Sequence, residues 1–556
     1  MTPPELGTRT KVLVLAGTML GLLVSAVNQT VVSTALPRIV GELGGVGMFS
    51  WIITSFMLTS TAVVPLVGKL SDVYGRKPLF MLGILVFMAT SAIAGLSQDI
   101  LQLIVFRALQ GVGAGMLMAN AFAIIGDVFP PAERGKYQGL FSAVFGLASV
   151  VGPGLGGAIT DHLSWRWVFY VNIPFGLLAL AVLGWGFPPL SRQPGRPPVD
   201  YLGVAAMMLA VVPLLLALVW GGDQYPWLSA PVVGLLCLAA AGLALFLLAE
   251  SRAADPILPL PLFRDRVFVV ANGVTFLTGI AMFGAISFMP LFVQGALGAS
   301  ATNSGLVTMP MMVGLVLAST ASGQVVSRLG RYRLLVLTGV AITAAGMFLL
   351  SRMDASTTTG TATVNMVVMG VGLGMSMPVL GLVVQNALPY RLLGVASAST
   401  QFFRQVGGLM GVAVFGTLMN TNLRAKLGQS MPETVGGRVP GELLAPLQDA
   451  RVLLQPETLD GLQGRFVAAL AEDGIVLFAQ ALAALREALA ESLAPLFFIG
   501  FVLSVLGLAM ALFLPELPLR RSLEEEPASL RQTGMGPRPA ENPSPYPSPA
   551  ASGEEG

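Results

Sequence analysis

Long, continuous runs of apolar residues alternate along the chain with short polar segments. About 20 residues of apolar helix cross the roughly 30 Å hydrocarbon core of a bilayer, and only helices and closed barrels satisfy their backbone polar groups there. Barrel strands would alternate apolar and polar positions with a period of two, which these runs do not do. The pattern predicts fourteen transmembrane helices, near residues 12–36, 49–69, 79–97, 99–128, 137–160, 166–187, 200–220, 230–250, 267–293, 302–326, 333–351, 361–387, 395–420 and 491–514.

The composition excludes several classes of protein. Hydrophobic residues make up 54% of the 556 residues and charged residues only 11%, whereas soluble domains carry about 25% charged residues. So few charges cannot cover a water-facing surface, which excludes a soluble enzyme, a disordered chain and a nucleic-acid-binding protein. The only cysteine is Cys237 and the only histidine is His162, so we expect no disulfide framework, metal site or catalytic centre. These features indicate an all-α polytopic membrane protein.

Lysine and arginine are distributed unevenly among the loops, and cytoplasmic loops are the ones enriched in these residues. With the N-terminus inside, the inner segments hold Arg9, Lys11, Lys69, Arg76, Lys77, Arg134, Lys136, Arg192, Arg196, Arg252, Arg264, Arg266, Arg328, Arg331, Arg333 and Arg391. The short outer loops hold only Arg38, Arg166 and Arg352. This bias predicts that both termini lie in the cytoplasm, including a short N-terminal segment, 1–11. The membrane is expected to be a bacterial-type plasma membrane.

Two longer segments are predicted outside the membrane. Residues 421–490 would lie on the outer side, where the Ala- and Leu-rich stretch 456–491 repeats apolar residues at helical spacing and predicts an amphipathic helix or helical hairpin. This segment is either a packing cap or a docking site for substrate or an extracytoplasmic accessory protein. The last segment, 515–556, is rich in Pro, Ser and Glu and is predicted to be a disordered cytoplasmic tail.

The chain contains an internal repeat. The segment GKLSDVYGRKPLFML (68–82) resembles GQVVSRLGRYRLLVL (323–337). The residues matched at a spacing of 255 are Gly68, Gly75, Arg76 and Leu79 with Gly323, Gly330, Arg331 and Leu334. The matches at a spacing of 259 are GVGAGM (111–116) with GVGLGM (370–375), Pro130 with Pro389, and Gly135 with Gly394.

The repeat predicts the domain organisation. It pairs an inner loop with an inner loop, so the two halves run parallel. Six spans would form an N-terminal half, 12–187, and six a C-terminal half, 267–514, with two inserted helices in the linker 188–266. Pseudo-symmetric halves around a site at the membrane midplane are typical of alternating-access transporters.

Four motifs resemble those of the major facilitator superfamily, and more narrowly its fourteen-span drug:proton antiporter branch. They are GKLSDVYGRK (68–77), RALQGVGAG (107–115), GLASVVGPGLGG (146–157) and WRWVFYVNIPFG (165–176). The resemblance covers about residues 10–515. It implies a secondary exporter of lipophilic or amphiphilic compounds that is energised by the proton gradient. The binding site of such an exporter opens alternately to the two sides of the membrane.

The resemblance also implies a conformational latch. An alternative is that the charges only mark the inner side and the glycines only form turns. Asp127 lies 20 residues after Arg107, about 30 Å along a helix, which places it at the inner membrane interface. The latch would hold the outward-open state by pairs worth a few kcal/mol. Its residues would be Gly68, Asp72, Gly75, Arg76, Lys77 and Asp127.

Two arginines lie within predicted spans. An unpaired arginine in the membrane costs at least about 3 kcal/mol, so Arg107 and Arg404 are expected to have a role in coupling or substrate contact, or as hydrogen-bond centres. Gln110 lies three residues after Arg107 and therefore shares its helix face. These three residues and Asn28 form the predicted substrate and proton pathway.

The span at 137–160 is rich in glycine. Its proline removes a backbone hydrogen bond, and its glycines allow a neighbouring helix to approach closely; the resemblance implies an antiport hinge. The hinge residues would be Gly146, Gly152, Pro153, Gly154, Gly156 and Gly157. The GVGAG of 111–115 follows no strand and is not a nucleotide fingerprint, and no GxxxxGK[ST] motif is present. We therefore expect no nucleotide or other cofactor.

Asn28 departs from the family pattern. In AVNQTVVSTALP (26–37), relatives of this branch usually place an aspartate that takes up the coupling proton and pairs with the arginine corresponding to Arg107. An amide cannot titrate, and none of the 29 acidic residues lies in the middle of a predicted span. Two explanations compete. In the first, Asn28 is an introduced residue that traps one state. Alternatively, coupling uses Asp127, another group at a span edge, or no group at all.

The leading hypothesis is multidrug efflux of lipophilic compounds. Embedded arginines without an embedded acid favour neutral or anionic amphiphiles over cations. Lipid or glycolipid export is the second hypothesis, and a membrane sensor or scaffold without transport activity is the third. A cavity between the halves would be lined by flexible apolar side chains, for which Met57, Met116, Met282 and Phe283 are candidates.

Overall fold

The computed structural model describes residues 7–43, 48–186, 200–222, 224–253, 255–299, 301–432, 435, 437–448, 452–453, 456–470 and 473–520. Fourteen segments in these ranges are helical, long and apolar enough to cross a membrane. This result confirms the predicted all-α polytopic fold.

The N-terminal half contains six spans. Its helices are α1 (Thr8–Leu43), α2 (Phe49–Tyr74), α3 (Arg76–Ala94), α4 (Ile100–Val128), α5 (Pro131–His162), α6 (Trp167–Tyr170) and α7 (Asn172–Gly186). Short α6 and α7 together form the sixth span, which the sequence predicted as one helix over 166–187.

The inserted pair and the C-terminal half follow. The inserted helices are α8 (Tyr201–Trp220) and α9 (Ala230–Arg252). The C-terminal half consists of α10 (Arg266–Leu291) with the π-helical η3 (Phe292–Ala296), α11 (Ala301–Leu329), α12 (Arg333–Ser351), α13 (Thr359–Ala387), α14 (Leu393–Ser430) and α18 (Asp473–Ala511). The short elements are η2 (Leu260–Arg264), η4 (Tyr390–Leu392), α16 (Gly441–Leu444), η5 (Ala445–Gln448) and α17 (Pro456–Leu470).

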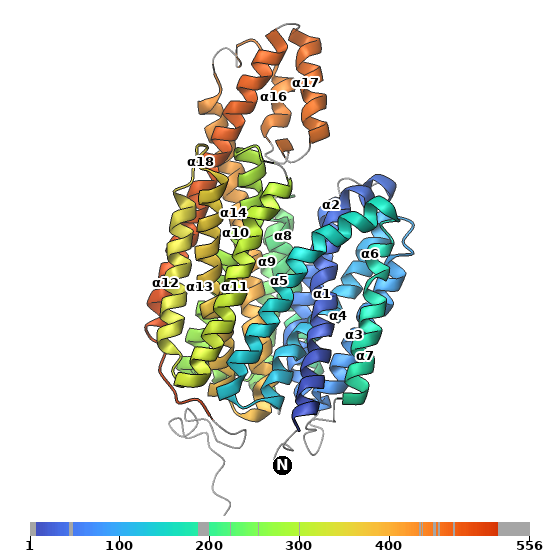
Figure 1. Cartoon of the computed structure of the whole chain (residues 1–556), viewed down its shortest axis with the longest axis vertical. Helices are drawn as coiled ribbons and strands as arrows, with labels where there is room; N and C mark the ends of the chain where they lie inside the picture. The colour runs from blue at the N-terminus through green and yellow to red at the C-terminus, as the bar shows by residue number, and fades with distance from the viewer. Residues whose placement is uncertain are drawn as a thin grey trace, which may run out of the picture.

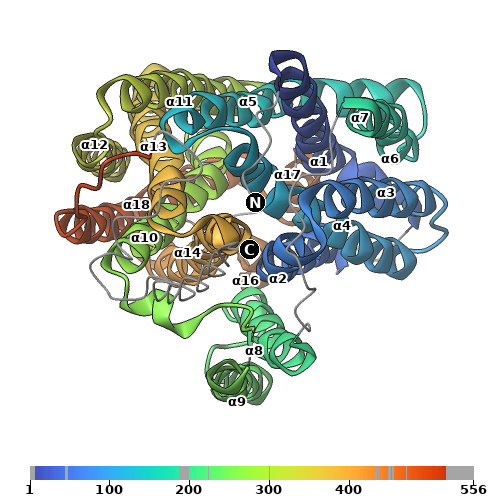
Figure 2. The same cartoon turned by 90° about the horizontal axis from the view of Figure 1, so that it is seen from below.

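The two halves lie side by side, α8 packs outside them against α2 and α14, and α9 packs on the outer side of α8 (Figure 2). Contacts between the halves run mainly through two helix pairs, α2 with α14 and α5 with α11. These pairs are related by the sequence repeat. The linker residues 187–199 lie outside the described residues.

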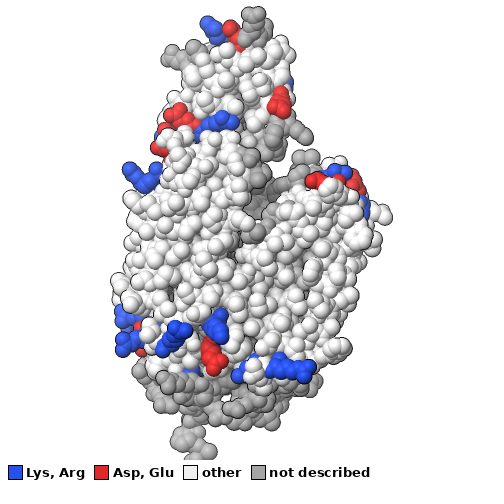
Figure 3. All heavy atoms as spheres, viewed as in Figure 1, with Lys and Arg blue, Asp and Glu red and all other residues white. Residues whose placement is uncertain are grey.

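The ends of the bundle differ. We call the end where α1 begins and α18 ends the termini end, and the opposite end, which carries α17, the hairpin end (Figure 1). Gly68 contacts Gly394 and Gly135 contacts Gly323 near the termini end, so the halves touch there. At the hairpin end the halves separate, and a cleft lies between them (Figure 3). The Lys and Arg side chains visible on this face lie toward the two ends of the molecule, and the surface between them carries none.

The segment outside the membrane is built on two long helices. A hairpin of α17 and the first part of α18 confirms the predicted helical hairpin. However, α14 continues to Ser430 and α18 already begins at Asp473, so both helices extend beyond the predicted span ends at 420 and 491. Lys426 and Glu491 form an ion pair of 2.9 Å between the extended helices.

The prediction of a disordered tail over 515–556 is wrong for residues 515–520. Residues 515–520 pack against the termini end, where Leu514 and Leu519 are buried. Burial of these leucines and hydrogen bonds to α13 supply the stabilisation that the Pro- and Glu-rich composition concealed. The rest of the predicted tail, 521–556, lies outside the described residues.

Candidate functional site

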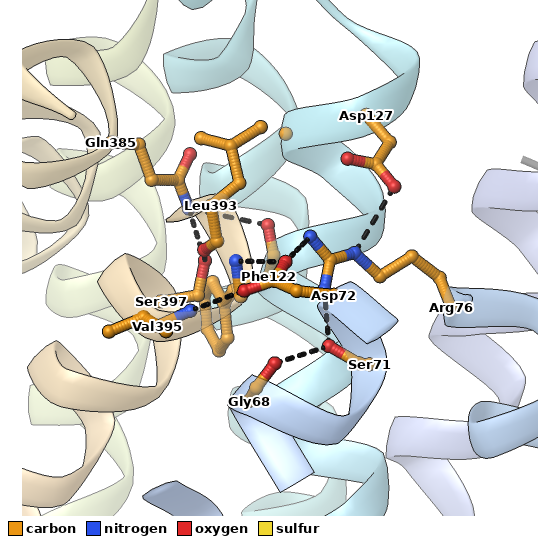
Figure 4. Close-up of polar contacts among 12 residues, drawn as sticks. Gly68, Ser71, Asp72, Arg76, Phe122, Asp127, Gln385, Leu393, Val395 and Ser397 are labelled. Atoms are coloured by element: carbon orange, nitrogen blue, oxygen red, sulfur yellow. Dashed lines mark hydrogen bonds and ion pairs between the residues drawn. The ribbon is translucent and has the colours of Figure 1, made fainter. Parts of the chain in front are cut away.

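The predicted latch charges gather at the termini end. Gly75 separates α2 from α3 with a φ of 95°, a left-handed value that glycine adopts readily, and this turn places Asp72 and Arg76 beside α4. Arg76 Nε donates to Asp127 Oδ2 at 3.2 Å, and the same guanidinium donates to Asp72 and Ser71 (Figure 4). All three charged side chains are buried, so their pairing offsets the cost of desolvation.

Asp72 also connects the two halves. Its carboxylate accepts hydrogen bonds from the backbone N–H groups of Gly394, at 3.0 Å, and Val395, at 3.2 Å, in the first turn of α14. The first N–H groups of a helix lack internal partners, and the helix dipole favours an anion there. The cluster therefore joins α2 and α4 of one half to α14 of the other.

Not every predicted latch residue belongs to this cluster. Gly68 does, because an added Cβ would meet Ala398 and the Gly394 carbonyl at 2.8 Å. Lys77 instead reaches the carbonyl of Gly184 at 3.3 Å, at the end of α7.

A second arginine closes the termini end from the other side. Arg134 Nε donates to Phe129 O at 2.9 Å and Nη2 donates to Gly126 O at 2.6 Å. Its Nη1 lies 3.4 Å from Gln385 Oε1 on α13, and Gln385 Nε2 donates to Phe122 O at 3.3 Å. Arg134 was predicted only as an inner charge and Gln385 was not predicted at all, although the repeat relates the two helix ends on which they lie.

Arg107 lies in a polar network inside the N-terminal half. Its side chain is buried, and Nη1 donates to Asn28 Oδ1 and to Gln110 Oε1, both at 2.7 Å. Nε donates to Ile52 O at 3.1 Å, and the guanidinium lies 4.2 Å from the centre of the Phe56 ring. The structure thus brings three of the predicted pathway residues together.

The network extends to Ser91 and Asn172, which were not predicted from the sequence. Gln110 Nε2 and Asn172 Nδ2 each donate to Ser91 Oγ at 2.9 Å. All three side chains are buried. Asn172 is the amide within the WRWVFYVNIPFG motif, and its polarity in an apolar stretch was the available signal.

Within the described residues, no acidic side chain forms an ion pair with Arg107. Asn28 must present its oxygen to the arginine because arginine only donates. The Asn28 amide nitrogen, which is buried, has no hydrogen-bond partner among those residues. The arginine is therefore held by neutral acceptors, and Asn28 cannot exchange a proton with it.

Arg404 lies apart from Arg107, on α14. Its guanidinium lies beside polarisable groups. Nη1 is 3.9 Å from Met377 Sδ, and the guanidinium is 6.0 Å from the centre of the Phe122 ring in the other half. The next residue is Gln405, and its Oε1 accepts a hydrogen bond of 2.6 Å from Thr61 Oγ1 across the halves. Arg404 is only partly buried, so it is an accessible cation between the halves.

The glycines of the predicted hinge play different parts in α5. Added Cβ atoms at Gly152 and Gly156 would meet Thr30 and Thr34 of α1, whereas Gly146 faces Val316 of α11 at 2.8 Å. Gly154 and Gly157 have no close neighbour there. The side chain of Pro153 lies outside the described residues. Two glycines therefore serve close packing against α1, and the hinge role stays a prediction.

The four candidate cavity residues are spread over both halves. Met116 is buried against Val64 and Ala398, at the contact between the halves. Met282 packs against the core of the C-terminal half, Phe283 lies against Gly408, and Met57 lies beside a small core in the N-terminal half. No group of three His, Cys, Asp or Glu side chains suited to a metal occurs among the described residues.

Two pseudo-symmetric six-helix halves with buried charges at their contact define a secondary transporter fold. The sequence profile of the Major Facilitator Superfamily matches residues 18–412. Multidrug transporter protein MdtP of Bacillus subtilis is 38% identical over 93% of this chain and 95% of its own length. Multidrug resistance protein 3 of the same organism is 39% identical over 77% of this chain and 83% of its own length. The chain belongs to the major facilitator superfamily.

Solved structures with the same fold are more distant in sequence. The human organic anion transporter MFSD10 superposes with a TM-score of 0.59 at 15% identity, over 89% of this chain and 99% of its own. The proton:xylose symporter XylE gives a TM-score of 0.57 at 14% identity, over 92% and 98%. The protein is a transporter of this superfamily rather than an enzyme.

Proposed function

We propose that this protein exports lipophilic and amphiphilic compounds across the plasma membrane by alternating access, in exchange for protons. The observation that carries the proposal is the asymmetry of the contact between the halves: buried hydrogen bonds from the start of α14 to Asp72 join them at the termini end, and a cleft opens at the hairpin end. Relatives named as multidrug transporters support efflux. The excess of Lys and Arg at the termini end supports a cytoplasmic position for both termini.

In this proposal the latch sets the balance between two states. Opening the termini end separates Asp72 from the first turn of α14 and withdraws Gly68 from Gly394. Loss of a buried charged contact costs a few kcal/mol, which is enough to shift a two-state equilibrium by tenfold or more. Substrate bound between the halves would supply part of this energy.

The coupling proton needs an acid other than Asn28. Asp127 is the best candidate: it is 3% exposed, and its Oδ2 accepts from Arg76. Its Oδ1 has no hydrogen-bond partner among the described residues. A proton on Oδ1 would neutralise the carboxylate, weaken the pair with Arg76 and favour opening at the termini end. Its release would restore the latch.

The preferred substrate follows from the embedded charges. Arg404 is partly exposed between the halves, beside the sulfur of Met377 and the ring of Phe122. A guanidinium in that setting attracts an anionic or polarisable group and repels a cation. We propose neutral and anionic amphiphiles as substrates.

The test is efflux of a neutral lipophilic dye from proteoliposomes with and without a proton gradient. Transport that a protonophore abolishes supports the proposal, and gradient-independent dye movement contradicts it. Arg107→Ala should abolish efflux, whereas the exposed Arg252→Ala should not. Efflux retained in Arg107→Ala would favour a membrane sensor or scaffold over a transporter.

Asn28→Asp decides where the proton binds. If the aspartate variant is coupled and the parent is inert, Asn28 traps one state. If both are equally coupled, the proton site lies elsewhere, and Asp127→Asn should then remove the dependence of efflux on the gradient.

Lipid export is a second candidate, favoured by one observation. A cavity of about 470 Å³ lies at the hairpin end, between α12, α14 and α18. Its apolar wall includes Phe348 and Phe498, and its polar rim includes Arg352, Lys426 and Glu491. This arrangement suits an acyl chain with a charged headgroup. Movement of a fluorescent phospholipid that is lost in Phe498→Arg, with dye efflux retained, would establish this activity.

A further inference from the structure

The residues that follow α18 form an ordered strap across the termini end. We call residues 515–520 the C-terminal strap. Tyr332 Oη donates to Pro515 O at 2.7 Å and accepts from Leu517 N at 2.9 Å. Burial raises the pKa of the Tyr332 hydroxyl, so it remains protonated and can donate. Glu516 Oε1 accepts from Tyr332 N at 2.7 Å. The strap is thereby fixed to the start of α12.

The last described residue of the strap, Arg520, binds the end of α13. Its Nη2 donates to the carbonyls of Gln385 at 2.9 Å and Leu388 at 3.0 Å. Its backbone N–H donates to Asn386 Oδ1 at 3.1 Å, and Asn386 Nδ2 donates to Pro518 O at 3.2 Å. The final carbonyls of a helix lack internal partners and carry the negative end of the helix dipole. A buried guanidinium is well suited to both.

Arg520 also reaches the other half of the protein. Its backbone carbonyl accepts the N–H of Ala132 at 3.3 Å, in the first turn of α5. That N–H is one of the groups that a helix start leaves without an internal partner. One residue therefore satisfies the end of α13 with its side chain and the start of α5 with its carbonyl. These helices belong to opposite halves.

We propose that Arg520 is a gating residue and that the C-terminal strap is a second latch on the termini end. Separation of α5 from α13 must break the bond from Ala132 or withdraw Arg520 from α13. The strap therefore stabilises the state that is open at the hairpin end. This inference rests on the proposed alternating access.

The test measures distances between spin labels on the two halves of the full-length protein in nanodiscs. The exposed Cys237 is first replaced by serine. Labels at exposed Glu133 and Leu329 report on the termini end, and labels at exposed Leu163 and Ala355 report on the hairpin end. Arg520→Ala should raise the population open at the termini end at least threefold. The exposed Arg264→Ala should leave both distributions unchanged.

Two further variants guard against misfolding as an explanation. Ala132→Pro removes only the N–H that binds the Arg520 carbonyl, at a helix start where proline is tolerated, and it should shift the population in the same direction by a smaller factor. Arg520→Lys keeps the charge but loses the planar fork, and should fall between parent and Arg520→Ala.

The outcomes separate this proposal from the proposed function. The distance measurement needs neither substrate nor gradient, so it can fail while efflux persists. Unchanged distributions in both Arg520→Ala and Ala132→Pro would overturn the gating role. Equal shifts in Arg520→Ala and Arg264→Ala would overturn it too, because a general loss of positive charge would then explain the effect.

Discussion

The α2–α14 and α5–α11 contacts both join the two halves and are related to each other by the sequence repeat. Their backbones approach each other in a similar way. Gly68 meets Gly394 in one, and Gly323 meets Gly135 in the other. Gly75 and Gly330, which follow α2 and α11, both have a left-handed φ, 95° and 67°. The close approach of the halves is therefore a shared property of the repeat.

The charges differ between these contacts. Asp72 and Asp127 pair with Arg76 on the first side. At the repeat spacings their counterparts are Ser327 and Asn386, which cannot be anions. Asn386 binds the C-terminal strap, and the strap carbonyl serves the start of α5. Glycines therefore determine how closely the halves approach, whereas different polar contacts on the two sides determine how stable the closed termini end is.

Asp72→Asn should have the largest effect. Gly394 N and Val395 N donate to different oxygens of the carboxylate, one of which the amide replaces with a donor, and Arg76 loses one of its two anions. Removing one partner of a buried pair costs roughly 3–5 kcal/mol, so we expect the termini end to open by more than about 100-fold relative to the parent. Spin-label distances measure this. Asp99→Asn is the control, because Asp99 also caps a helix, at 2.8 Å from Gln102 N, without joining the halves. An unshifted Asp72→Asn would refute the latch.

Gly323→Ala and Gly68→Ala should have similar, smaller effects. The added Cβ would meet the backbone of Gly135 in one case and of Gly394 in the other, and backbone atoms cannot move aside. Overpacking of this kind costs about 1–3 kcal/mol, which predicts an opening of roughly 10- to 100-fold.

Gly234→Ala in α9, with no neighbour at its Cβ, is the control for these glycine variants. A large effect at Gly68 and none at Gly323 would mean that the glycine contacts are not equivalent. The matched glycines of the repeat would then limit the approach of the halves on only one side.

Much of this comparison could be predicted from the sequence. The apolar runs located the spans, and the repeat paired Gly68 with Gly323 before either contact was visible. The resemblance grouped Asp72, Arg76 and Asp127, because short motifs keep their local geometry. These predictions depend on patterns within one segment or on matched segments.

The remaining features depend on which distant segments meet. Spacing along the chain does not reveal that Asp72 faces the first turn of α14, or that Ser91 accepts a hydrogen bond from Gln110. Arg520 was assigned to a disordered tail because composition averages over 515–556, while its binding depends on two helix ends brought together by the fold. The extension of α18 to Asp473 was missed for a related reason: hydropathy marks where lipid ends, not where a helix ends.

Asp127→Asn should have a moderate effect, since it makes this side resemble Asn386 on the other. The amide oxygen can still accept from Arg76, so only the charge of the contact is lost, a difference of about 1–2 kcal/mol. We expect opening of the termini end by roughly 5- to 30-fold, and loss of its dependence on pH if Asp127 carries the proton. Accessibility of cysteines at both ends measures the shift, with the exposed Asp161→Asn as control. Unchanged accessibility at both ends would remove Asp127 from the latch.

Arg331→Ala should have the smallest effect and is the sharpest test of the asymmetry. Arg331 corresponds to Arg76 in the repeat, but it is exposed, and among the described residues it has no ion pair. Substitutions at such surface positions usually change stability by less than about 0.5 kcal/mol, so the distances should shift by less than about twofold, whereas Arg76→Ala should open the termini end as strongly as Asp72→Asn. A shift in Arg331→Ala equal to that in Arg76→Ala would mean that both sides use their arginines alike. The α5–α11 side would then already carry a charged latch of its own. The C-terminal strap would not be needed to replace one.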